Sequence, residues 1–293
     1  MKHTVLLALL AAVISGISIY VNSLFVSGAD PLAFVLVRNA LVAALLFAGI
    51  LVFRGLPYFR LPLSDWKKLI VVGIVGGGIP FVLFFTGLRE TGGVAGNIIN
   101  KSLFLWVTML AYISLKEKPK PAALAALAFL AAGTFAGSGI MDLKPGRGLF
   151  MVLAATMIWS VEYILAKRTL KTVPVTLLAF GRMLFGLPVL VVWSAFRGTL
   201  TAPVGIMPQF LLPVALSGFL LALFMVSWYG ALRRSPAYLV SGLLTVSPAV
   251  SVFAAAGFSG KPVTGNFWSI GLLAAGAILI TVSALRRPSV HES

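Results

Sequence analysis

Long hydrophobic stretches alternate with short polar connections along the whole chain. Each stretch is close to the length of about 20 residues that an α-helix needs to cross the hydrocarbon core of a bilayer. Because every backbone polar group inside hydrocarbon must be paired within its own segment, we expect helices. The pattern predicts ten of them, at residues 5–26, 31–53, 69–88, 92–115, 122–140, 149–166, 174–196, 210–231, 237–258 and 267–285.

Composition places these helices in lipid and excludes a soluble enzyme. Hydrophobic residues make up 60% of the chain and charged residues 10%, against about 45–50% and about 25% in soluble proteins. A compact soluble fold of this size could not hide so much apolar surface. The longest connections, 54–68 and 197–209, leave no room for a soluble domain. We therefore expect an all-α membrane protein.

The basic residues predict its orientation. The chain carries 23 Lys and Arg against 7 Asp and Glu, a net charge of +16. In a soluble protein this excess would indicate nucleic-acid binding, but here the basic residues form short clusters between spans, so we expect no nucleic-acid partner. With the N-terminus inside, 15 of them face the cytoplasm and five the other side. This asymmetry favours the cytoplasmic membrane with both termini in the cytoplasm.

The sequence also repeats at an offset of 144 residues. Arg38 maps onto Arg182, and Arg89 maps onto Arg233. Each copy holds five spans, an odd number, so the second copy must enter the membrane upside down. Such inverted repeats, with polar groups near the midplane, are the architecture of alternating-access carriers. The two copies are residues 1–145 and 146–293.

Four ionisable residues lie inside the predicted spans: Arg38, Lys101, Glu162 and Arg182. Each costs about 2.5–3.5 kcal/mol on insertion scales, so each needs a reason to be there. For Arg38 and Arg182 we expect structural roles, because their symmetric positions suit pairing across the repeat axis or capping of loosened backbone with a rigid set of five donors.

Lys101 is the most central of the four. Asn97, Lys101 and Thr108 recur at helical spacing and Asn100 is adjacent, which gives one polar face. A polar face in a span must point into a cavity or the protein interior. In one interpretation Lys101 binds a substrate carboxylate or phosphate that the two amides orient. In the other, it pairs with Glu162 and locks two helices.

Glu162 is the only acid well inside a span. A lone carboxylate there suits proton coupling or the binding of a substrate ammonium group. An ion pair with Arg182, at a similar depth, is the equally weighted alternative. Trp159 and Tyr163 flank Glu162 at helical spacing, and their apolar rings with polar tips suit an amphipathic substrate.

In the ninth span, Thr245 occupies the position of Lys101 under the repeat. Pro248 removes a backbone hydrogen bond there, which is tolerated where a cavity or neighbouring groups satisfy the freed carbonyl. The spans contain no histidine and no second acid, and the chain has no cysteine and no nucleotide-binding loop. We therefore expect no enzyme, no metal site and no cofactor.

These features together resemble the drug/metabolite transporter superfamily, in its ten-helix, EamA-like form. The residues that carry the resemblance are Arg38 and Arg182, Trp159-Ser160, Gly87-Leu88-Arg89 with Ala231-Leu232-Arg233, Ser247-Pro248 and Glu117. The resemblance implies a secondary carrier that exports amino acids or related metabolites by alternating access. It also implies that the fifth and tenth helices lie at the periphery of the molecule.

Three positions depart from the superfamily pattern. Phe104 stands where a proline is usual in the fourth span, Lys261 stands where an acid would be, and Lys101 is not a general feature. Lys101 leaves room for a more anionic substrate. We expect the bilayer and a small polar or amphipathic molecule as partners. A transporter of lipid or phosphate-bearing substrates and a non-transporting scaffold are the alternatives, and the oligomeric state stays open.

Overall fold

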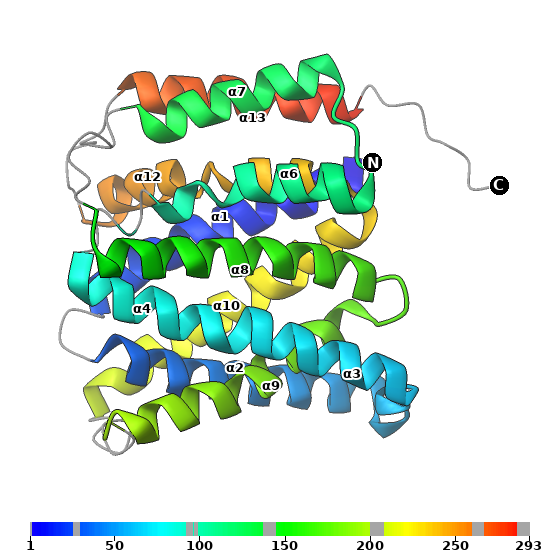
Figure 1. Ribbon diagram of the computed structural model, residues 1–293, viewed down its shortest axis with the longest axis vertical. Helices are drawn as coiled ribbons and strands as arrows, with labels where there is room; N and C mark the ends of the chain where they lie inside the picture. Colours follow the sequence, from blue (N-terminus) through cyan, green and yellow to red (C-terminus); the bar gives the residue numbers. More distant parts are fainter. Residues whose placement is uncertain are drawn as a thin grey trace.

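The computed structural model describes residues 2–25, 30–91, 96, 99–136, 145–199, 208–259 and 267–285, and the regular structure in these residues is helical (Figure 1). The elements are α1 (Lys2–Phe25), α2 (Pro31–Arg54), the 3-10 turn η2 (Leu56–Phe59), α3 (Leu63–Val72), the π-helical segment η3 (Gly73–Gly78), α4 (Ile79–Thr91), α6 (Leu103–Leu115), α7 (Pro121–Phe135), α8 (Arg147–Thr169), α9 (Val175–Phe196), α10 (Pro208–Arg234), α11 (Ala237–Leu244), α12 (Ser247–Ser259) and α13 (Phe267–Leu285).

Every predicted span contains a helix. In the described residues, eight helices are long and apolar enough to cross a membrane, and two shorter apolar ones cover Ile99–Leu115 and Pro121–Phe135. The third predicted span, 69–88, is longer than expected because α3, η3 and α4 run on as one helical segment, Leu63–Thr91. The ninth is one segment, Ala237–Phe258, that is broken between α11 and α12.

The helices pack in a pattern that is unchanged when the two halves are exchanged. α1 packs on α10 and α12 of the second half, and α8 packs on α4 and α6 of the first. α2 pairs with α9, and α7 pairs with α13 at the periphery, at the top of Figure 1. α1 and α8, which correspond under the 144-residue offset, run in opposite directions in the same view.

The closest backbone approach between the halves lies where η3 meets α9. A Cβ atom added at Gly77 would lie 2.1 Å from the carbonyl oxygen of Arg182, and one added at Gly186 would lie 2.4 Å from the carbonyl carbon of Gly77. Neither backbone can retreat without separating the helices, so both positions require glycine. Small residues at a helix interface permit this approach, which lets short side chains and backbone groups meet across it.

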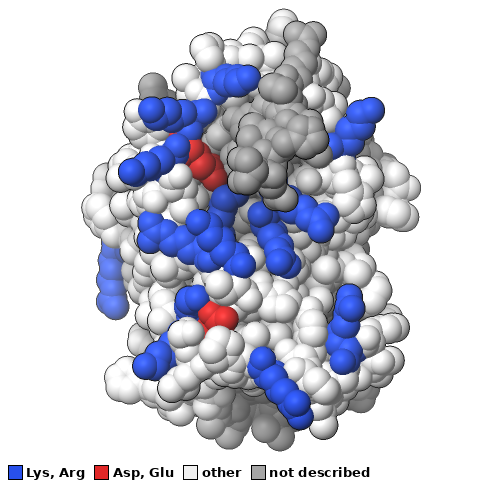
Figure 2. All heavy atoms as spheres, turned by 90° about the vertical axis from the view of Figure 1, so that its right-hand side faces the viewer, with Lys and Arg blue, Asp and Glu red and all other residues white. Residues whose placement is uncertain are grey.

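The basic residues gather at one end of the helix bundle, the right-hand end in Figure 1, which faces the viewer in Figure 2. We call it the basic end. Three described basic residues, Arg89, Arg147 and Arg197, lie at the opposite end. The described Lys and Arg residues of the basic end are Lys2, Arg54, Arg60, Lys67, Lys68, Lys116, Lys118, Lys120, Lys167, Arg168, Lys171, Arg233 and Arg234.

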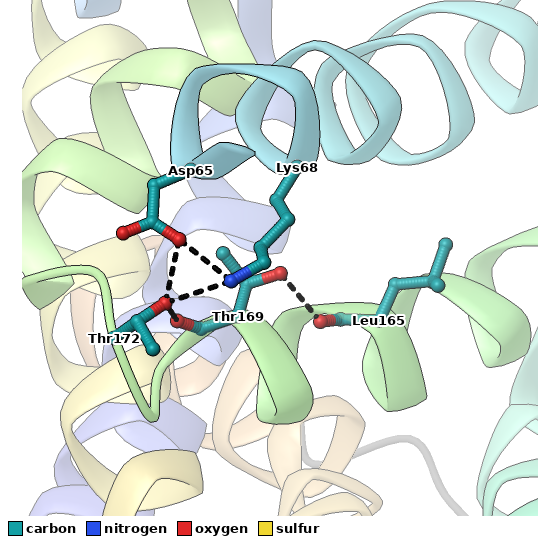
Figure 3. Close-up of polar contacts among 5 residues, drawn as sticks. All are labelled: Asp65, Lys68, Leu165, Thr169 and Thr172. Atoms are coloured by element: carbon teal, nitrogen blue, oxygen red, sulfur yellow. Dashed lines mark hydrogen bonds and ion pairs between the residues drawn. The ribbon is translucent and has the colours of Figure 1, made fainter. Parts of the chain in front are cut away.

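Two groups of polar contacts tie helices together at the basic end. In the first, Asp65 at the start of α3 meets the connection from α8 to α9 (Figure 3). Lys68 Nζ lies 2.6 Å from Asp65 Oδ1, and the hydroxyl of Thr172 donates to the same oxygen at 2.8 Å. Asp65 is 5% exposed, so these partners replace the water that its carboxylate has lost.

The second group is centred on Lys167 near the end of α8. Its Nζ lies 3.4 Å from Glu117 Oε1 and donates to the carbonyl oxygens of Leu232, at 3.2 Å, and Ser235. Glu117 Oε2 accepts a hydrogen bond of 2.7 Å from the backbone N–H of Ala237, at the start of α11. Lysine thus caps the end of α10 while glutamate caps the next helix, as the helix dipoles favour.

We expect Gly77→Ala to lower the thermal unfolding midpoint of the detergent-purified protein. Overpacking of this kind costs about 1–3 kcal/mol. Gly49→Ala in α2 is the matched control, because a Cβ there meets nothing within 4 Å. This control should raise the midpoint slightly, since alanine in a helix is favoured over glycine by about 0.5–1 kcal/mol. Equal shifts for the two variants would contradict the close approach.

Candidate functional site

A cavity of about 400 Å³ lies between the two halves of the chain. Its volume falls within the range of about 300–1,000 Å³ that is usual for small-molecule sites. Among the predicted site residues, Asn97 lies outside the described residues. The others line this one cavity: Arg38, Asn100, Lys101, Trp159, Glu162, Tyr163, Arg182, Thr245 and Pro248.

The cavity wall is built from equivalent positions of the two repeats. Sixteen of its lining residues fall into eight pairs that are 144 positions apart. The pairs are Ser15 with Trp159, Ile19 with Tyr163, Arg38 with Arg182, Phe84 with Trp228, Asn100 with Leu244, Lys101 with Thr245, Leu103 with Ser247, and Phe104 with Pro248. The cavity therefore lies where the two repeats face each other.

Glu162 on α8 forms an ion pair with Arg182 on α9, with 3.7 Å between Oε1 and Nε. The hydroxyl of Tyr229 on α10 donates to the same oxygen at 2.6 Å. Glu162 is 0% and Arg182 6% exposed. Of the interpretations left open by the sequence, the ion pair with Arg182 is the one observed, whereas no ion pair between Glu162 and Lys101 is present among the described residues.

The π-helical segment η3 packs against this ion pair. Pro80 has no N–H group, so it leaves the carbonyl oxygen of Gly76, four residues earlier, open to other donors. That oxygen accepts hydrogen bonds from Arg182 Nη2 at 3.1 Å and from Trp159 Nε1 at 3.0 Å. A Cβ at Gly76 would lie 2.5 Å from Glu162 Cγ. Arg182 thus caps loosened backbone, which is one of the two structural roles that the sequence left open for the intramembrane arginines.

Arg38 has a different environment from its counterpart Arg182. Arg38 is 9% exposed, and its Nη2 donates a weak hydrogen bond of 3.4 Å to the amide oxygen of the neighbouring Asn39. Its Nε atom is buried and has no hydrogen-bond partner among the described residues. The guanidinium carbon lies 5.8 Å from the centre of the Phe34 ring. No described carboxylate pairs with it.

Lys101 is half-buried at the cavity wall, and no ion pair with it occurs among the described residues. The described acids other than Glu162 form ion pairs at the two ends of the bundle. Asp30 pairs with Arg89 and Glu90 lies 4.0 Å from Arg147 at the end opposite the basic one. Asp65 and Glu117 are held in the two groups of contacts at the basic end.

Two helical segments that correspond under the repeat, Ile99–Leu115 and Ala237–Phe258, are both interrupted beside the cavity. α11 ends at Leu244 and α12 begins at Ser247. Pro248 cannot donate to the carbonyl of Leu244, and the hydroxyl of Ser247 donates to it instead at 2.6 Å. The sequence did not predict the matching break before α6 at Ser102, whose hydroxyl donates to the carbonyl of Ile99 at 2.7 Å.

This break corrects one expectation about the polar face of the fourth span. Thr108 does not line the central cavity with Lys101 and Asn100 but faces a separate groove between α6 and α7. Its hydroxyl donates to the carbonyl oxygen of Phe104 at 2.7 Å. Because the helix is not continuous through Ser102, spacing counted across it does not place side chains on one face.

Aromatic rings cover the remaining wall in two groups. Trp159 lies 5.4 Å from both Phe81 and Phe84 between ring centres. Tyr163 and Trp228 are 4.7 Å apart, and Phe224 lies 5.7 Å from Trp228. Sequence reasoning had named Trp159 and Tyr163 but missed Phe81, Phe84 and Phe224. The repeat offset could have found Phe84, because it is the counterpart of Trp228.

The described residues contain no group of three or more His, Cys, Asp or Glu side chains that could hold a metal ion. What the arrangement offers is a largely apolar cavity with basic groups, the amide of Asn100, several hydroxyls and aromatic faces. These groups can bind and orient a small molecule.

Glu162→Gln should destabilise the protein strongly, because it leaves the Arg182 charge buried without its partner. Breaking a buried pair costs about 3–5 kcal/mol. The double variant Glu162→Gln with Arg182→Gln removes both charges and should recover part of the loss. Thermal unfolding in detergent measures both. A double variant less stable than Glu162→Gln alone would show that the two charges do not stabilise each other.

Comparison with known proteins agrees with this architecture. The EamA-like transporter family matches residues 2–138 and 146–283, once in each half. A solved crystal structure, titled only as that of a protein, is similar over 98% of this chain and 99% of its own, with a TM-score of 0.79 and 20% identity, which shows a shared fold. A search of curated proteins found no match. The chain belongs to the EamA-like transporter family.

Proposed function

We propose that the protein is a secondary active carrier that moves small polar or amphipathic metabolites, amino acids or related molecules among them, out of the cell by alternating access. Membership of the EamA-like family supports a multi-pass membrane transporter. In the proposed arrangement ten helices cross the membrane as two inverted repeats, residues 1–145 and 146–293. The opposite directions of α1 and α8 and the exchangeable packing support the inversion.

The orientation proposed for the carrier follows from its charges. The basic end contains most of the described Lys and Arg residues, and such residues concentrate on the cytoplasmic side of membrane proteins. α1 begins at this end and α13 ends there (Figure 1). We therefore place the basic end, with both termini, in the cytoplasm, and the membrane is the cytoplasmic membrane.

The cavity shared by the two repeats is the observation that carries the proposal. Carriers with inverted repeats bind substrate near the midplane, between the repeats, where discontinuous helices expose polar groups. The breaks at Ser102 and at residues 245–246 have that position here. We propose Lys101, Asn97, Asn100, Thr245, Trp159 and Tyr163 as the substrate-binding residues, with Arg38 and Pro248 shaping the site.

In this proposal, the conformation seen in the structure is closed toward the cytoplasm. Tyr163, Glu162, Trp228 and Ser241, which line the cavity and lie within two turns of a helix terminus at the basic end, are 0–3% exposed. Behind them, the contacts of Lys167 with Glu117 join α6, α8, α10 and α11. Opening toward the cytoplasm requires these contacts to separate. Lys167 and Glu117 keep 18% and 12% of their side-chain surface exposed, so water can reach them when the contacts separate.

Cysteine labelling separates a carrier from a membrane scaffold. The chain contains no cysteine, so one introduced residue gives an unambiguous signal. Thr245→Cys should react with a small aqueous thiol reagent, because its position lines the cavity. Ala126→Cys, at a position 0% exposed in α7, is the matched control and should stay unreacted. Failure of Thr245→Cys to react in the folded protein would remove the carrier proposal and favour the scaffold.

We further propose that Glu162 couples transport to protons. Its Oε2 atom is buried without a hydrogen-bond partner among the described residues, while Arg182 and Tyr229 both face Oε1. Glu162→Gln should flatten the pH dependence of amino-acid flux into proteoliposomes. Tyr229→Phe keeps the carboxylate and should retain that dependence. If Glu162→Gln transports with an unchanged pH profile, the ion pair with Arg182 is structural alone.

A further inference from the structure

We infer that the cavity selects organic anions with an aromatic or similarly flat apolar body, and that Arg38 and Lys101 hold the acidic group. This inference rests on the proposed function, because it names the substrate class of the same cavity. It favours organic acids over zwitterionic amino acids.

The first support is the charge of the cavity wall. Arg38, Lys101 and Arg182 line it together with a single carboxylate, Glu162, which leaves a formal excess of two positive charges. The Glu162 charge is engaged by Arg182, and the other described acids are held at the ends of the bundle. Charges in a low-dielectric site interact strongly, so an unbalanced cationic wall favours an anionic ligand.

The second support is the way the two repeats differ. At the positions 144 residues apart, Arg38 and Arg182 are the same residue type, but their surroundings are not. Glu162, the partner of Arg182, corresponds to Ser18 in the first half, and Lys101 corresponds to Thr245 in the second. Each difference makes the first-half side of the cavity more positive. Among the described residues, the half of the cavity that lacks a built-in counter-charge is therefore the half that carries Lys101.

Arg38 and Lys101 both reach the cavity from the first half of the chain, from α2 and from the turn just before α6. Neither has a carboxylate partner among the described residues, whereas Arg182, also at the cavity wall, is paired with Glu162.

Aromatic rings also line the cavity and define the rest of the ligand. Phe81, Phe84 and Trp159 form one group of rings, and Tyr163, Phe224 and Trp228 form another. A volume of about 400 Å³ is enough for one ring with an acidic side arm, since about 150 Å³ accommodates a benzene molecule. The rings can stack on an aromatic body while the cations pair with its acid.

A zwitterion would need an acidic partner for its ammonium group. Glu162 is the one described acid at the cavity, it is 0% exposed, and its Oε1 already meets Arg182 and Tyr229. Releasing it for a substrate would leave Arg182 buried without a counter-charge, which is expensive. An anion without an ammonium group avoids that loss.

Binding of matched small probes to the full-length, detergent-purified protein tests the inference. 3-Phenylpropionate carries the ring and the acid, 3-phenylpropylamine replaces the acid by a cation, and L-phenylalanine is the zwitterion. A ligand raises stability in proportion to ln(1 + [L]/Kd), so thermal shift at millimolar probe ranks their affinities. We expect 3-phenylpropionate to bind at least about tenfold more tightly than the other two.

Two substitutions of Lys101 locate the acidic group. Lys101→Thr copies the residue of the second repeat and should weaken 3-phenylpropionate binding about tenfold or more. Lys101→Arg keeps the charge and should retain most of the affinity. Lys118→Thr, the same change at an exposed position of the basic end, should have no effect. Arg38→Gln is a second test, provided that this variant keeps the wild-type unfolding midpoint.

Tighter binding of phenyl phosphate than of 3-phenylpropionate would support the anion site and identify phosphate esters as the class. Preference for the amine or zwitterion, absence of binding by both anions, or unchanged affinity in Lys101→Thr would overturn the inference. Labelling of Thr245→Cys distinguishes the two levels of failure. If this cysteine reacts and 3-phenylpropionate does not protect it, the carrier proposal stands and the anion inference falls. If it does not react, the carrier proposal itself falls.

Discussion

The buried contact between Glu162 and Arg182 is the interaction around which the centre of the protein is organised. Two charges in lipid-buried protein are tolerable only when each is paired and further hydrogen-bonded. Tyr229 donates a hydrogen bond to the carboxylate, and the guanidinium donates one to the carbonyl of Gly76. That carbonyl is available because the helix widens into a π turn before Pro80, and the turn needs glycine because side chains would collide with the charged pair. Backbone geometry, glycine content and charge pairing thus depend on one another at this point.

The two repeats supply nearly the same wall positions to the cavity, but they do not supply the same chemistry. In the second half, Arg182 is neutralised by Glu162 and is bound to backbone. In the first half, Arg38 has no described carboxylate partner, and Lys101 adds a further cation. A pseudo-symmetric scaffold suits a carrier because related conformations can be reached by exchanging the roles of the halves. In our proposal, this loss of symmetry in charge is what gives the cavity its preference for an anionic ligand.

The ends of the bundle serve a different purpose from its centre. At the basic end, lysines pair with Asp65 and Glu117 and cap helix termini, so that α3, α6, α8, α10 and α11 are held together by polar contacts near the surface (Figures 2 and 3). The close backbone approach of η3 and α9 and the buried charges of Glu162 and Arg182 lie deeper. In the carrier that we propose, the polar contacts of the basic end separate while the centre keeps its structure.

The sequence by itself determined the ten helical segments, the repeat and most of the central residues. Hydrophobic length and the cost of charge in lipid leave few choices, so Lys101, Glu162 and Arg182 stood out without a structure. Tertiary structure alone decided that Glu162 pairs with Arg182 and not with Lys101, because the choice depends on which helices pack together. The tertiary structure also showed the break at Ser102, which the sequence does not indicate because no proline lies there. A pattern counted along one helix cannot show where that helix stops, nor which neighbour's carbonyl or ring will lie beside it.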